Sequence, residues 1–137
     1  MEHLVIVFGI LETGNLWKGH LGEAELFVKY DVFPDGSYKF IEHIKNTTKN
    51  EDEKHGNTEK MYKVKSLILD CDCMAACVLS PNFKKMAANS SIQPIVIKGC
   101  DNVEDFIKKI ANNYTLISEK VMKRKNGARD VDIPVLL

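Results

Sequence analysis

The chain has 137 residues, 45% of them hydrophobic, and its 19 basic side chains balance 19 acidic ones. This length suits one domain with a single core, and the balanced charge gives no overall attraction to nucleic acid or an anionic membrane. The apolar run at residues 4–11 is too short to span a bilayer and lacks the basic flank of a signal peptide. We therefore expect a cytoplasmic protein without nucleic-acid or membrane partners, and its four cysteines are not expected to form structural disulfides.

The first half of the chain predicts three strands. Residues 3–10 (HLVIVFGI) are almost continuously apolar, which is typical of a strand covered on both faces. A loop with three glycines follows at residues 11–25. Residues 25–32 and 37–44 are β-type segments joined by a Pro-Asp-Gly turn, so they predict a hairpin. The polar stretch at residues 46–57 has no aliphatic side chains and predicts an exposed loop.

The second half predicts helices alternating with buried strands. A helix is expected over residues 58–69, a strand within 71–79, a helix from Ser80-Pro81 to about residue 89, and a strand over 92–97. Asp101 or Asn102 caps a third helix, and this order favours an α/β sheet with parallel neighbours. Residues 1–113 are thus expected to form the α/β domain. Residues 114–137 are a C-terminal extension with a helical start and an apolar tail that docks on the domain or on a second subunit, as in a homodimer.

Cys77 and Cys100 each lie between a predicted strand and a predicted helix N-terminus. The carboxyl ends of parallel strands meet at one edge of a sheet, where ligands bind, so we expect these two thiols to approach one another. Helix N-termini stabilise thiolates. The pair could hold a metal or a cluster, form a redox disulfide, or simply pack.

Cys71 and Cys73 are harder to include in the same site. Along a regular strand, Cys73 and Cys77 would lie about 13 Å apart, which one metal ion cannot bridge. Either the strand ends near Ala75 and the chain folds back to form a four-cysteine site, or Cys71 and Cys73 are small buried residues.

Two histidines are further candidates. His20 lies in the glycine-containing loop after the first strand, which opens toward the same edge of the sheet. His55 lies in the polar loop, from which it could reach a bound group or remain solvated. The sequence has no Ser-His-Asp signature, P-loop or G-x-G-x-x-G motif, so we expect no enzyme activity.

The order of these motifs resembles the dinitrogenase iron-molybdenum cofactor biosynthesis family. Residues 19–27 (GHLGEAELF) are similar to the family's His-Phe-Gly-x-Ala-x-x-Phe segment before its second strand. The resemblance continues through the hairpin, His55-Gly56, the strand at Asp72 and the Pro81-Asn82 helix, and it covers residues 3–113. Two departures are Val78-Leu79-Ser80 in place of a glycine-rich turn, and the clustered cysteines.

The resemblance implies an α/β fold of the ribonuclease H-like type. This is a three-layer domain with a central mixed five-stranded sheet, in which a first strand and a β-hairpin precede alternating helices and parallel strands. It also implies a carrier or chaperone that binds an iron-sulfur or molybdenum-containing cluster and exchanges it with a donor or acceptor protein. Zinc is the alternative metal. The resemblance implies that His20, Cys77 and Cys100 line the site. With the candidates from the residues themselves, the expected cofactor-binding residues are His20, His55 and Ser80, and the expected metal ligands are Cys77, Cys100, Cys73 and Cys71. Two other hypotheses remain, an interaction module that dimerises through the tail and a thiol redox switch through Cys77 and Cys100.

Overall fold

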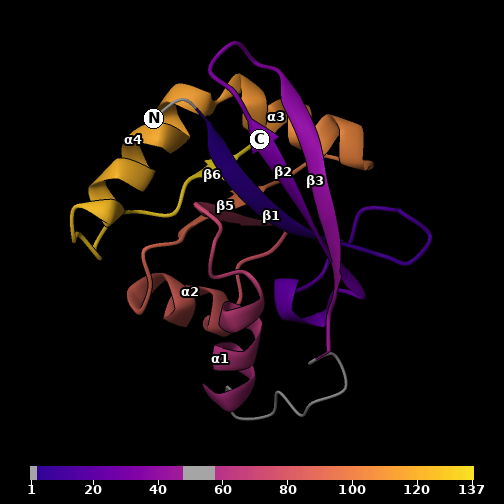
Figure 1. Cartoon of the computed structure of the whole chain (residues 1–137), viewed down its shortest axis with the longest axis horizontal. Helices are drawn as coiled ribbons and strands as arrows, with labels where there is room; N and C mark the ends of the chain where they lie inside the picture. The colour runs from indigo at the N-terminus through magenta and orange to yellow at the C-terminus, as the bar shows by residue number, and fades with distance from the viewer. Residues whose placement is uncertain (1–2, 48–57) are drawn as a thin grey trace.

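The computed structural model describes residues 3–47 and 58–137 (Figure 1). Within these ranges the strands form one six-stranded sheet in the order β3-β2-β1-β4-β5-β6. Strands β1, β4, β5 and β6 are parallel, and β2 and β3 run antiparallel to their neighbours. The strands are β1 (Leu4–Ile10), β2 (Leu26–Val32), β3 (Tyr38–Lys45), β4 (Cys73–Ala76), β5 (Gln93–Ile97) and β6 (Val135–Leu136).

Helices cover both faces of this sheet, which gives the predicted three layers (Figure 1). One core cluster joins the sheet to α3 and α4, and the other joins it to α1, α2 and the short helix after β1. The helices are η1 (Leu21–Glu23), α1 (Thr58–Leu67), α2 (Pro81–Ala88), α3 (Val103–Asn112) and α4 (Tyr114–Lys125). None of the helices in the described ranges has the length and apolar character needed to cross a membrane.

Local signals in the sequence locate the hairpin and the helix starts correctly. The hairpin turn closes with a 2.9 Å hydrogen bond from the Phe33 amide to the Ser37 carbonyl. Ser80 caps α2, because its hydroxyl accepts a hydrogen bond from the Phe83 amide at 3.1 Å. Of the two candidate caps for α3, Asn102 is the one used, since its side chain accepts from the Asp105 amide at 2.8 Å.

Strand β4 is shorter than the apolar stretch at residues 71–79 suggests. The Cys71 amide donates to the Ile68 carbonyl at 3.0 Å, so Cys71 belongs to the turn after α1. The Asp72 carboxylate accepts a hydrogen bond from the Val5 amide at 2.8 Å, which fixes the start of β4 beside β1. The chain leaves the sheet after Ala76.

The C-terminal tail docks on its own domain. Strand β6 pairs with β5, and this adds a sixth strand to the five that were expected. Tyr114, Ile117, Val121 and Leu136 are all buried in the same core cluster as β1 and α3. The extension therefore completes the core instead of extending away from it.

The glycine at position 9 permits a close approach between β1 and the loop that follows it. A Cβ at Gly9 would lie 2.6 Å from the Ala24 Cβ and 3.2 Å from Trp17 Cδ1. We expect Gly9→Ala to lower the free energy of unfolding by about 1–3 kcal/mol, because the Ala24 Cβ cannot move away without a shift of its backbone. Urea unfolding followed by the fluorescence of Trp17, the single tryptophan, measures this effect. An unchanged unfolding midpoint would show that the loop yields freely.

Candidate functional site

The carboxyl ends of β1, β4 and β5 meet at one edge of the sheet, because these three strands are parallel and adjacent. We call this edge the rim. It is formed by the loops that follow the three strands, at residues 11–25, 77–80 and 98–102. Such an edge is where α/β sheets hold ligands.

The structure places Cys77 and Cys100 at the same rim, after the neighbouring parallel strands β4 and β5. Cys77 follows β4 directly and is half-buried, while Cys100 follows β5 and is 7% exposed. Both side chains pack against the same core cluster. The Cys77 thiol donates a 3.8 Å hydrogen bond to the Trp17 carbonyl in the β1 loop. Burial, and then the charge of Cys100, raise the pKa of Cys77 above its ordinary value.

Lys18 places a positive charge beside these thiols. Its ammonium forms a 2.7 Å ion pair with Asp101, so the pair connects the β1 loop to the start of α3. The bond to Asp101 and the charges of both thiols raise the pKa of Lys18, and in return Lys18 opposes the rise in the pKa of Cys77. Sequence reasoning did not find Lys18. The only signal was its place in the loop with three glycines, directly before Gly19.

Trp17 shapes the same loop. Its indole Nε1 donates a 2.7 Å hydrogen bond to the carbonyl of His20. A Cβ at Gly19 would lie 2.6 Å from Trp17 Cζ2, so only glycine fits beside the ring without displacing it. The indole thus fixes the path of the loop that carries both Lys18 and His20.

The structure does not bring all four cysteines together. Cys71 packs in the cluster beneath α1 and α2, whereas Cys73 packs in the cluster beneath α3 and α4, on the opposite face of the sheet. Burial raises the pKa of Cys71 to about 12 and also raises the pKa of the fully buried Cys73. Within the described ranges, no three or more His, Cys, Asp or Glu side chains are grouped to hold a metal ion. The surroundings of Cys71 and Cys73 match the alternative that treats them as small core residues.

The remaining candidates differ in position. His20 is exposed and immediately precedes η1 at the rim. Ser80 is buried and its hydroxyl is engaged as the α2 cap, so that oxygen already serves the fold. His55 lies outside the described residues.

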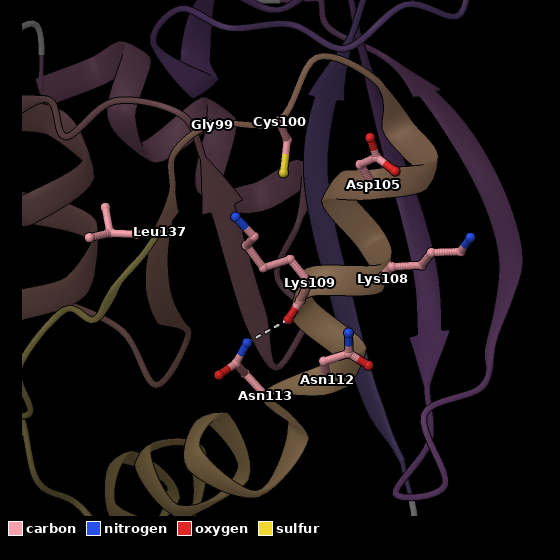
Figure 2. A pocket seen from close by; sticks show the side chains of 8 residues that line it. All are labelled: Gly99, Cys100, Asp105, Lys108, Lys109, Asn112, Asn113 and Leu137. Carbon is pink, nitrogen blue, oxygen red and sulfur yellow. Dashed lines mark hydrogen bonds between the residues drawn. The ribbon is translucent and has the colours of Figure 1, made fainter.

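A hollow of about 430 Å³ opens beside Cys100, between α3 and the C-terminal residue (Figure 2). Figure 2 shows the Cys100 sulfur and the Lys109 side chain directed into it. The Lys109 ammonium donates to the Lys98 carbonyl at 3.2 Å. The lining residues are Gly99, Cys100, Asp105, Lys108, Lys109, Asn112, Asn113 and Leu137. Cys100, although largely buried, thus borders a hollow on the α3 side.

The raised pKa of Cys77 predicts how this thiol reacts with pH. Alkylation requires the thiolate. With a pKa above its ordinary value of 9.0, Cys77 is protonated at neutral pH. The rate of its reaction with iodoacetamide should therefore rise about tenfold per pH unit from pH 7 to pH 9. Mass spectrometry of the labelled peptide measures the rate, with Cys77→Ser as the control. A plateau near pH 7 would contradict this prediction and favour a redox-active thiol.

A family model matches most of the chain. The family model described as dinitrogenase iron-molybdenum cofactor matches residues 4–113, which include both Cys77 and Cys100. Residues 114–137 lie outside the match although they pack on the same core. No curated protein matches the chain.

Proposed function

Because the chain belongs to the dinitrogenase iron-molybdenum cofactor family, we propose that it carries a metallocluster bound at the rim and passes it to another protein. Membership of the family supports involvement with the iron-molybdenum cofactor of nitrogenase. The observation that supports carriage is the convergence of Cys77 and Cys100, from two separate strand ends, on one partly open edge.

The chemistry of the rim suits an iron-sulfur or iron-molybdenum cluster as cargo. Thiolates are soft ligands that hold iron and iron-sulfur clusters, and imidazole can complete such a site. Cys77 and Cys100 would supply the thiolates, whereas the exposed His20 lies at the same rim but is not grouped with them in the described structure. The ammonium of Lys18 would offset negative charge that develops when both thiols lose their protons.

Two protein thiols leave other positions of a cluster available. A donor or acceptor protein could occupy these positions during transfer, which suits a carrier better than a site of permanent storage. Binding and release make and break only metal-ligand bonds, so the proposed role is ligation without turnover. A cytoplasmic location, where thiols stay reduced, fits this chemistry.

The redox-switch hypothesis is less well supported. It requires a thiol with a lowered pKa, whereas burial raises the pKa of Cys77. Zinc would use the same two thiols, and metal analysis distinguishes it from a cluster.

Anaerobic reconstitution tests the proposal. The purified chain is incubated with ferrous iron and sulfide without oxygen, desalted, and assayed for visible absorbance and for iron, molybdenum and zinc. We expect broad sulfur-to-iron charge-transfer absorbance and iron that remains with the protein. A colourless protein free of iron after this treatment would overturn the proposal, and one that retains only zinc would identify a zinc site.

A further inference from the structure

Strand β3 lies at the outer edge of the sheet (Figure 1). In the part of the chain that the structure describes, no strand pairs with its outer side. Its side chains are largely exposed, including two large apolar ones, Phe40 at 46% and Ile41 at 38%. An open edge of this kind can pair with a strand from another molecule.

An irregularity in β3 changes which side chains share a face. Tyr30 of β2 lies opposite Phe40, but the preceding Lys29 lies opposite Glu42, so Ile41 is an extra residue in β3. In a regular strand, residues three apart point to opposite faces. The extra residue removes this alternation across positions 39–42.

Lys39 and Glu42 therefore lie on the same face of the sheet. Lys39 is opposite Asp31 and Glu42 is opposite Lys29, and these two partners in β2 are two residues apart. Tyr38, Phe40 and His43 lie on the other face, because they are opposite Val32, Tyr30 and Val28 of β2. There, the Phe40 ring contacts the His43 ring at 4.8 Å between centroids.

The pattern of faces is consequently symmetric about the midpoint between Phe40 and Ile41. We propose that two copies of this chain pair antiparallel through their β3 edges, about a twofold axis at that midpoint. In this register, Lys39 lies opposite Glu42 of the partner subunit, and Glu42 lies opposite Lys39 of the partner subunit. Tyr38 lies opposite His43 of the partner subunit on the other face.

Charge complementarity identifies a second copy as the occupant of this edge. Edge lysines and extra residues ordinarily prevent strands from pairing edge to edge, because a foreign strand leaves the charge unpaired. In its own chain Glu42 has a 4.0 Å contact with Lys29, which Asp70 holds more closely at 2.6 Å. Across the axis the exposed Lys39 and Glu42 face each other, so each copy adds an opposite charge to the other. Opposite charges facing each other across antiparallel strands stabilise the pair, and like charges destabilise it.

The pairing does not depend on the proposed carrier role. Strand β3 is separated from β4 by two strands, so two copies joined at β3 leave Cys77 and Cys100 accessible. Failure of one proposal would therefore leave the other standing.

Charge exchange tests the pairing. Sedimentation velocity over a concentration series should show a reversible dimer of the wild-type chain. Lys39→Glu or Glu42→Lys alone places like charges opposite each other twice, so each should weaken dimerisation about tenfold or more. The double variant Lys39→Glu with Glu42→Lys restores complementarity and should dimerise as the wild type does. It also shows that the single changes do not act by unfolding.

Three results would overturn the proposal. The first is a wild-type chain that stays monomeric at every concentration. The second is dimerisation of the single variants at the wild-type level, and the third is a double variant that dimerises as weakly as the single variants. Unchanged dimerisation of the single variants would place the contact on another surface.

Discussion

Replacing Arg124 with methionine should lower the free energy of unfolding by about 3–5 kcal/mol. Arg124 is 1% exposed, and it is among the largest fully buried side chains of the described residues. Its guanidinium donates to Gln93 Oε1 at 2.5 Å, to the Ala87 carbonyl at 2.6 Å and to the Val131 carbonyl at 2.9 Å. It thus joins α4 to β5, to α2 and to the tail. Methionine fills much of the volume but leaves two buried acceptors and one partly buried acceptor without this donor.

The size of this effect matters because a domain of this length is stable by only about 5–15 kcal/mol in total. Urea unfolding of the variant, followed by circular dichroism, gives the change. Arg129→Met is the matched control, since exposed Arg129 only donates to the Arg124 and Ala128 carbonyls, and it should cost less than about 1 kcal/mol. Equal losses in the two variants would contradict the role given to Arg124.

Changing both Cys77 and Cys100 to serine should abolish retention of the cluster. Serine keeps the size but replaces a soft thiolate with a hydroxyl that binds iron weakly. Changes in the residues around metal ligands alone typically lower metal affinity 10- to 100-fold. Loss of two ligands should therefore lower it by more than about a hundredfold. Iron content after anaerobic reconstitution and desalting measures the effect.

Cys71→Ala is the matched control for the thiol substitutions. Its sulfur lies in the core cluster beneath α1 and α2. Cys77 and Cys100 pack in the other core cluster, on the opposite face of the sheet beneath α3 and α4. The control should retain iron at the wild-type level, and both variants should show wild-type circular dichroism. Retention of iron by the double-serine chain, or its loss in the control, would show that the ligands lie elsewhere.

Features with short-range signals could be predicted from the sequence. The hairpin follows from Pro34-Asp35-Gly36, and the start of α2 follows from Ser80-Pro81. In each case the backbone conformation is set by a few adjacent residues. The strand and helix alternation then leaves few ways to connect the sheet, and this is why Cys77 and Cys100 could be placed at one edge.

Features that depend on distant contacts could not be predicted. Two residues of β6 carry too little pattern to indicate a strand, and their pairing with β5 is a contact between segments far apart in the sequence. Arg124 sits in a basic run that suggests a solvated helix face, yet its guanidinium is buried by partners from three other segments. The ion pair of Lys18 with Asp101 joins residues 83 positions apart, and no local motif specifies it.

The most direct test of the carrier proposal is a crystal structure of the reconstituted protein, with anomalous scattering measured at the iron absorption edge. We predict an anomalous peak at the rim, bonded to the sulfur atoms of Cys77 and Cys100. A peak bonded to other residues, with both thiols free, would contradict the account.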